Sequence, residues 1–167
     1  MQLAENHYYD NSDFHRVIED FVIQGGDPTS TGMGGESIWN EEFAPEISDR
    51  LYHINGALYM ARFEGDVSEK TQGSQFYIVS NDIDQTDTIK EHEQLKKMIP
   101  YLLTEEDHPP EILEDYKNGG APFLDTQYTV FGQMIDGIDI VKEISKVEAD
   151  HDGLPKEKVT IYSIKTQ

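Results

Sequence analysis

The chain has no cysteine among its 167 residues. Disulfide bonds, thiol catalysis and cysteine-ligated zinc are therefore excluded. Positive charge is also scarce, because 13 lysine and arginine residues stand against 33 aspartate and glutamate residues, giving a net charge of −20. This excess argues against a nucleic-acid backbone or an anionic membrane surface as partner, since like charges repel. We interpret the negative charge as an aid to solubility.

Long apolar runs are missing as well. No stretch approaches the ~20 apolar residues that cross a bilayer, and the first residues, MQLAENHYYD, are polar and unlike a signal peptide. We therefore expect a cytoplasmic protein. The length suits a single domain over residues 1–167, and 9 tyrosines, 7 phenylalanines and 37% hydrophobic residues indicate a folded core.

Short segments rich in apolar and aromatic residues predict several β-strands, the first two separated by Glu19-Asp20. The segments are residues 14–18, 21–24, 56–62, 74–79, 128–134 and 159–166. One helix is expected over 137–147, where Ile138, Val141 and Ile144 share a helical face and Asp136 is the expected N-cap. Many short strands with few helices and glycine-rich connections predict a mainly β fold, an antiparallel barrel.

Residues 80–122 differ from the rest, because they are polar and acidic and their periodicity is helical. Pro109-Pro110 predicts the start of a second helix, and Gly119-Gly120 its end. We expect Ile112, Leu113 and Tyr116 to face inward. The segment is thus predicted to be a helical hairpin inserted between two barrel strands. An apolar stripe on its first helix is predicted from Leu95, Met98, Ile99, Leu102 and Leu103.

Three motifs occur in a fixed order: FHRVIEDFVIQGGD from Phe14, GSQFYIV at 73–79 and YTVFGQMIDGIDIV at 128–141. Together they resemble the cyclophilin family of peptidyl-prolyl cis-trans isomerases, from about Tyr8 to the C-terminus, with one large gap at about 80–122. The resemblance implies a cyclophilin-like antiparallel β-barrel. It also implies an enzyme that accelerates rotation about Xaa-Pro bonds in protein folding, without cofactor or metal.

This reaction moves no atoms between molecules. The peptide bond has partial double-bond character and a rotation barrier of ~18–20 kcal/mol. A catalyst must therefore favour the twisted form, by gripping the proline ring and by giving the imide nitrogen a hydrogen-bond donor. The resemblance places the catalytic arginine of the family at Arg16, whose guanidinium keeps its charge and offers several donors. The alternative is a surface arginine paired with Glu19 or Asp20.

The resemblance also implies a substrate-binding set. Gln24 is expected beside Arg16, where it orients the guanidinium and bonds the substrate backbone, and Gln75 is expected to bind that backbone too. Ala61 and Arg62 match the segment that lines the groove and pairs with the main chain of the peptide. The apolar pocket for the proline ring is expected to consist of Phe21, Val22, Tyr77, Leu124 and Tyr128, which would otherwise be core residues.

Four positions depart from the common family pattern. Phe123 stands where many members carry a tryptophan tied to cyclosporin binding, so weak cyclosporin binding is expected. Val22 replaces a common methionine and widens the pocket a little. Tyr128 replaces a common histidine, and its hydroxyl can still bond a substrate carbonyl. Arg62 replaces a common asparagine, which is a mild change if the main chain does the binding.

The N-terminus departs as well. Cyclophilins begin with two barrel strands and a helix before the first motif, whereas this chain starts at MQLAENHYYD, which looks like the end of that helix. We therefore expect an N-terminally incomplete barrel with an open edge. The insert at 80–122 is interpreted as a stabilising embellishment in preference to a rim that narrows access to the groove.

Other functions are weighed against this one. A proline-peptide-binding or chaperone module with little catalysis would keep the pocket but lose the arginine. The expected partners in either case are proline-containing peptides and unfolded or folding proteins. The six histidines are scattered, DHDG at 150–153 is interpreted as a turn, and GMGGES lacks the lysine of a phosphate-binding loop. No metal site is predicted, and the many acidic residues are interpreted as solvated surface.

Overall fold

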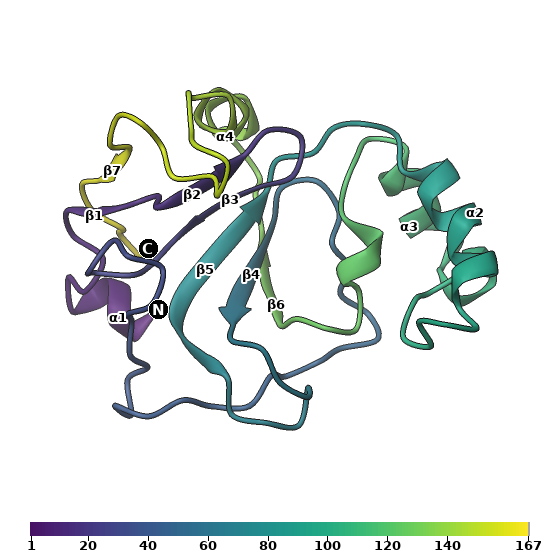
Figure 1. The fold of residues 1–167 in the computed structure, drawn as a ribbon, viewed down its shortest axis with the longest axis horizontal. Helices are drawn as coiled ribbons and strands as arrows, with labels where there is room; N and C mark the ends of the chain where they lie inside the picture. Colours follow the sequence, from purple (N-terminus) through teal and green to yellow (C-terminus); the bar gives the residue numbers. More distant parts are fainter. Residues whose placement is uncertain (167) are drawn as a thin grey trace.

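A five-stranded antiparallel sheet lies at the centre of the computed structural model, which describes residues 1–166 (Figure 1). Its strand order is β2-β3-β5-β4-β6, so β2 and β6 are the outer strands. A separate two-stranded sheet pairs β1 (Ser12–Asp13) with β7 (Thr160–Ile161). Within the described residues the strands do not close into a barrel, in agreement with the expected open edge. The five strands are β2 (Arg16–Ile18), β3 (Val22–Gly25), β4 (Ala57–Arg62), β5 (Gln72–Val79) and β6 (Val130–Gln133).

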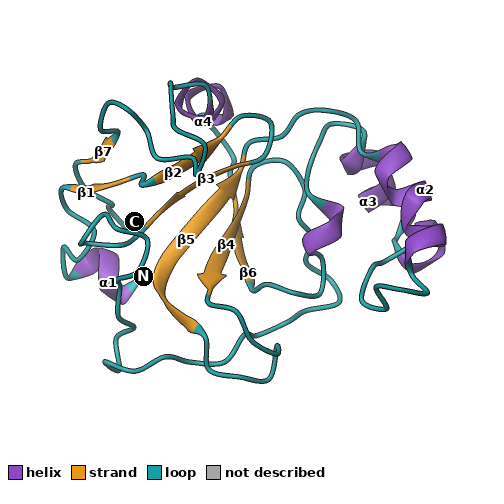
Figure 2. Ribbon diagram, viewed as in Figure 1, coloured by secondary structure: helices purple, strands orange, loops and turns teal. Residues whose placement is uncertain are grey.

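The two faces of the sheet carry different clusters, because successive strand residues point to opposite sides. Val22 and Tyr77 belong to one cluster. Ile23 and Val17 belong to the other, which is completed by Val141 of α4 (Ile138–Ser145). Figure 2 shows α4 beside β2 and β3, on which it packs. The first cluster faces away from α4 and becomes important for the site described below.

Helix α4 confirms the helix expected over 137–147, but the predicted N-cap is wrong. The N-cap is Gly137, whose φ of 80° is left-handed and favours glycine. Asp136 precedes it, and its side chain accepts a hydrogen bond from the Gly137 backbone N–H at 2.8 Å. At the other end of the chain, α1 (Gln2–Glu5) confirms that the first residues are helical.

The insert between β5 and β6 is helical, as expected, and projects to one side of the sheet (Figure 1). Within it, Pro110–Tyr116 (α3) confirms the second predicted helix, and Tyr116 is fully buried there. Ile112 and Leu113 pack against the cluster that Tyr116 forms with Tyr52 and Ile89. The other elements of this segment are α2 (Thr86–Leu95), η1 (Glu105–Asp107) and η2 (Pro122–Leu124).

The helix predicted to carry an apolar stripe over 95–103 is wrong, although Leu102 is buried and Leu103 packs against the cluster around Tyr116. Helix α2 ends at Leu95, and Met98 is 83% exposed. Pro100 prevents a continuous helix from running on to Leu103, because proline lacks a backbone N–H and its ring disfavours helical conformation in the preceding residue. The helix instead buries Ile89 and His92.

The predicted final strand over 159–166 is mostly absent. Only Thr160–Ile161 forms β7, because its partner β1 offers two residues for pairing. Tyr162, just beyond, is 81% exposed. None of the described helices has the length and apolar character needed to cross a membrane.

Candidate active site

The sheet register places the predicted catalytic arginine in a row of polar and aromatic residues. Arg16 of β2 pairs with Gln24 of β3, and Gln24 pairs in turn with Tyr77 of β5. Tyr77 pairs with Tyr59 of β4. Residues opposite each other in a sheet share a face, so the row runs from a cation, through an amide, to two stacked aromatic rings.

The five residues predicted to hold the proline ring gather in one apolar cluster. Val22 and Tyr77 are buried members of it, and the other three residues are partly buried around them. The rings of Phe21 and Phe123 lie 5.6 Å apart between centroids. Phe123 is 39% exposed, so this pair marks the edge where the cluster reaches solvent. The partly buried residues are Phe21, Leu124 and Tyr128.

Gln24 is held by Gln75. Its side-chain amide donates to Gln75 Oε1 at 3.0 Å, and Gln75 donates its own amide to the carbonyls of Gly32 and Gly34 at 3.0 and 2.7 Å. No side-chain hydrogen bond joins Gln24 to Arg16 among residues 1–166, although the two are register partners. The side-chain oxygen of Gln24, Oε1, is therefore available to a guanidinium or a substrate N–H.

The glycine-rich loop that anchors Gln75 is itself organised by Asp27, whose side chain is buried. Its carboxylate accepts hydrogen bonds from the backbone N–H groups of Thr29, Thr31, Gly32 and Gly34. Burial alone would raise the pKa of Asp27, but the hydrogen bonds from Thr29, Gly34 and Thr31 outweigh it and lower the pKa to about 2. The loop is thus fixed by an ionised carboxylate.

A cavity of about 60 Å³ adjoins this loop. Four predicted substrate-binding residues line it, namely Gln24, Ala61, Arg62 and Gln75. Phe63, Thr71 and Gly73 also line it. Phe63 and Thr71 were missed because the segment 63–72 lies outside every motif. Their position between the strand that ends at Arg62 and the glycine that opens GSQFYIV is the sequence signal that leads to them.

Arg62 is fixed by main-chain carbonyls on the far side of the groove. Its Nε donates to the Gln127 carbonyl at 3.0 Å and its terminal nitrogen to the Gly65 carbonyl at 2.8 Å. The guanidinium carbon lies 5.1 Å from the centre of the Tyr128 ring, a cation–π distance. Arg62 therefore holds Tyr128 in place.

Arg16 is half-buried on the outer strand β2. No ion pair joins it to Glu19 or Asp20 in the part of the chain that is described, so the paired surface arginine lacks its partner. A Cβ at Gly153 would lie 3.1 Å from Arg16 Cγ, so the stem of Arg16 packs closely against this turn. The Val17 N–H donates to the Gly153 carbonyl at 2.7 Å, which ties the turn to β2.

Aromatic rings stack beneath the pocket. His53 lies on Tyr59 at 3.7 Å between centroids, and Tyr59 lies on Tyr77 at 4.9 Å, both nearly parallel. Tyr128 packs edge-on against both ends, His53 and Tyr77. We name His53, Tyr59 and Tyr77 the aromatic column. Sequence reasoning missed His53 and Tyr59, although Tyr59 alternates on its strand with Ala57 and Ala61.

The DHDG segment forms a turn, as interpreted. The Asp150 carboxylate accepts hydrogen bonds from the backbone N–H groups of Asp152 and Leu154 at 2.9 and 3.0 Å. Asp150, His151 and Asp152 are all exposed and bring their side-chain atoms together. This is the arrangement of a turn-capping aspartate.

Known proteins resemble this chain over nearly its whole length. Residues 1–166 match the family described as cyclophilin type peptidyl-prolyl cis-trans isomerase/CLD. A Streptococcus pyogenes protein named as a bifunctional phosphatase/peptidyl-prolyl cis-trans isomerase is 43% identical over 97% of this chain, which spans 32% of that protein. A Staphylococcus saprophyticus protein named as a peptidyl-prolyl cis-trans isomerase is 40% identical over 96% of this chain, which spans 75% of it.

Solved structures agree. A Cryptosporidium parvum cyclophilin type peptidyl-prolyl cis-trans isomerase superposes with a TM-score of 0.69 and 30% identity, covering 97% of this chain and 76% of the other. The same protein in the presence of the dipeptide Ala-Pro gives a TM-score of 0.70 at 29% identity, covering 99% and 82%. The five-stranded sheet of this chain therefore has a cyclophilin fold, although it is not closed into a barrel.

Proposed function

This chain belongs to the cyclophilin-type peptidyl-prolyl cis-trans isomerases, whose reaction is rotation about the peptide bond before proline, and we propose that Arg16 drives that rotation here. Twisting the bond breaks its resonance and localises the lone pair on the imide nitrogen. A fixed guanidinium donor stabilises that form more than either planar form. The register that sets Arg16 beside Gln24, and Gln24 in turn beside Tyr77, supports this role most directly.

The proline ring is gripped by the apolar cluster, with the Phe21–Phe123 pair at its solvent edge. Gln24 offers its side-chain oxygen to a substrate N–H or to Arg16. Gln75 Oε1 accepts from Gln24 and has a second lone pair for the substrate. The main chain of Ala61 and Arg62 lines the groove beside them. The residues of the grip are Phe21, Val22, Tyr77, Leu124 and Tyr128.

Exchange NMR on a short proline peptide tests the role of Arg16. The unmodified chain is expected to accelerate cis-trans exchange, and Arg16→Ala to lower turnover about a hundredfold, the scale of losing one transition-state donor, with little change in peptide affinity. Arg50→Ala is the matched control, because it removes the same charge from an exposed residue. Equal losses of rate and affinity in Arg16→Ala would contradict a catalytic role.

A proline-peptide-binding or chaperone module with little catalysis is the second candidate. It is favoured by one observation: the apolar cluster and the anchored Gln75 make no hydrogen bond to Arg16 within residues 1–166, so a binding surface can exist without it. Tight peptide binding by the unmodified chain without accelerated exchange would support this candidate.

The substrates are proline-containing peptides and unfolded or folding proteins, and the site of action is the cytoplasm. Neither nucleic acid nor a membrane is a partner, because the net charge of −20 repels both. Cyclosporin binds weakly, since Phe123 has no N–H donor. Residues 1–167 act as one domain that carries the insert at about 80–122.

A further inference from the structure

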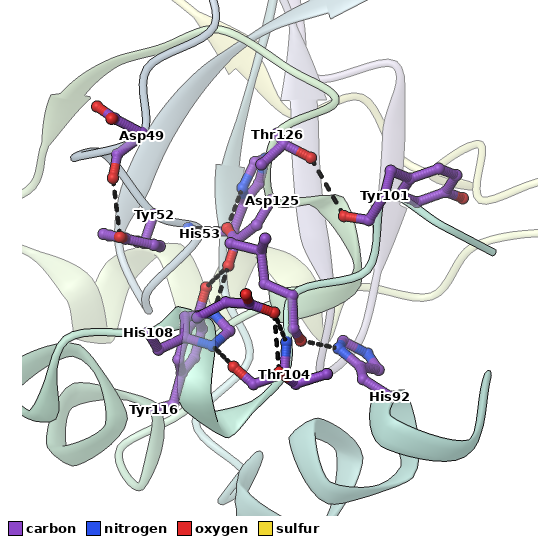
Figure 3. A network of polar contacts seen from close by, with 12 residues as sticks. Asp49, Tyr52, His53, His92, Tyr101, Thr104, His108, Tyr116, Asp125 and Thr126 are labelled. Carbon is purple, nitrogen blue, oxygen red and sulfur yellow. Dashed lines mark hydrogen bonds and ion pairs between the residues drawn. The ribbon is translucent and has the colours of Figure 1, made fainter. Parts of the chain in front are cut away.

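Asp125 follows the pocket residue Leu124 in the chain and is linked to the aromatic column beneath the pocket through His53. Its side chain is 1% exposed and accepts hydrogen bonds at both oxygens (Figure 3). Oδ1 accepts from the backbone N–H and the ring Nδ1 of His53, both at 2.8 Å. Oδ2 accepts from the Tyr116 hydroxyl at 2.6 Å and faces His108 Nε2 at 3.1 Å.

The partners of Oδ2 both come from the insert. Tyr116 is the last residue of α3, and His108 lies between η1 and α3. Both are buried, at 0% and 5% exposed. The insert therefore reaches under the pocket with polar side chains, beyond the apolar packing of Ile112 and Leu113.

The His108 ring faces an acceptor at each nitrogen. Nδ1 lies 2.7 Å from the carbonyl oxygen of Thr104, and Nε2 lies 3.1 Å from Asp125 Oδ2. A carbonyl and an ionised carboxylate donate nothing, and a neutral imidazole has only one N–H. Both contacts are hydrogen bonds only if the ring carries both protons and thus a positive charge.

The charge state of the other two groups agrees with this. Burial lowers the pKa of His53, against the pull of Asp125, and its Nε2 has no hydrogen-bond partner among residues 1–166. His53 is therefore neutral. Burial would raise the pKa of Asp125, but hydrogen bonds from His108 and His53 outweigh it and lower it. The buried, ionised carboxylate of Asp125 thus faces the buried ring of His108, and removing either partner of such a buried contact is costly.

We propose that His108 and Tyr116 are positioning residues of the isomerase pocket, which they hold in shape through Asp125. This inference rests on the proposed function, since it names the same pocket. The path is short: Asp125 bonds the backbone and ring of His53, and that ring begins the aromatic column. Tyr128 packs against both ends of the column, His53 and Tyr77. A shift of His53 therefore displaces the two pocket residues Tyr128 and Tyr77 together.

The first test is spectroscopic and uses the unmodified chain. Ring ¹⁵N NMR of His108 is expected to show both nitrogens protonated at neutral pH, and His53 to show a neutral ring protonated at Nδ1. Asp125→Asn is expected to return His108 to a neutral ring. A neutral His108 in the unmodified chain would overturn the charged pair and with it the proposal.

The second test separates positioning from stability. Tyr116→Phe removes only the hydroxyl, and His108→Gln removes the ring charge. Each is expected to raise KM for a proline peptide about five- to tenfold while kcat stays within about twofold. His92→Gln is the matched control, because His92 is also buried in the insert but bonds the Leu103 carbonyl instead of Asp125. Equal behaviour of all three variants would overturn the proposal.

Failure of the positioning role of His108 and Tyr116 can be told apart from failure of the catalytic role of Arg16. Arg16→Ala should abolish most turnover while the ¹⁵N signals of His108 stay unchanged, because Arg16 bonds no member of the Asp125 network. If the unmodified chain gave no turnover, the same comparison would be made with peptide affinity in place of KM. If His108→Gln failed to fold, Tyr116→Phe and the ring signals would still decide the question.

Discussion

Gln75 holds Gln24 across neighbouring strands, with Gln75 Oε1 accepting from the Gln24 amide at 3.0 Å. The side-chain amide of Gln75 donates hydrogen bonds to the carbonyls of Gly32 and Gly34. The orientation of Gln24 beside Arg16 is therefore set by a loop that lies outside the sheet. That loop is in turn set by the Asp27 carboxylate, so a buried acid controls a neutral residue of the site.

Gln75→Glu should disturb this chain of contacts with little change of shape. It would set a carboxylate against the carbonyls of Gly32 and Gly34, which repel it. We expect kcat/KM to fall about tenfold in exchange NMR, with the fold retained by circular dichroism. Gln133→Glu is the control, because Gln133 of β6 also donates its side-chain amide to a main-chain carbonyl, that of Asn55. A loss of activity equal to that of the control would contradict the role of Gln75.

Asp27→Asn should reduce stability and change its pH dependence. The pKa of Asp27 is lowered from 3.8 to about 2 in the folded chain. Its ionised form therefore contributes stability in full above pH 3.8, and this contribution, roughly 2 kcal/mol, is lost as the pH falls toward 2. Urea unfolding at pH 7, 4 and 2.5 measures it. The difference between the unmodified chain and the variant should shrink on acidification, and a constant difference would contradict the assignment.

Local motifs predicted much of the strand framework and the site. FHRV, QGGD and GSQF each place residues that pair across strands, and the expected pocket residues do form one cluster. The predictions that were wrong concern termini of elements. Pro100 prevents a continuous helix from running on to Leu103, and the two residues of β1 limit β7. The first depends on a single proline and the second on the length of a partner strand, and apolar periodicity reveals neither.

The residues behind the pocket could not be predicted for a different reason. His53 and Asp125 are 72 positions apart and lie in no shared pattern. A buried histidine and aspartate look like any solvated pair in a chain with 33 acidic residues. Only the tertiary fold brings them together, and the other partners of Asp125, His108 and Tyr116, come from the segment that the motifs leave as a gap.

Phe123→Trp should increase affinity for cyclosporin. Phe123 is 39% exposed at the edge of the pocket and packs against Phe21, so there is room for a larger ring. The indole adds the N–H donor that phenylalanine lacks. We expect the affinity to rise at least about tenfold by calorimetry, the scale of one added hydrogen bond in a desolvated site. Phe131→Trp, on an exposed residue of β6, should leave it unchanged. Equal affinity in both variants would contradict the prediction.

Replacing the insert should lower isomerase activity without abolishing it. Its ends already meet, because Asn81 Nδ2 donates to the Gly120 carbonyl at 2.8 Å and a Cβ on Gly119 would lie 1.9 Å from the Asn81 carbonyl oxygen. A short glycine-serine linker in place of residues 82–118 can therefore close the gap.

The deletion removes Tyr116 and His108, so the Asp125 carboxylate keeps only the His53 donors. An underpaired buried charge is strongly destabilising. Combining the deletion with Asp125→Asn should raise the urea midpoint above that of the deletion alone and keep measurable exchange of the proline peptide. A folded deletion variant with no activity at all would show that the insert contacts the substrate directly. An unchanged midpoint on adding Asp125→Asn would show that the Asp125 charge is not what the insert stabilises.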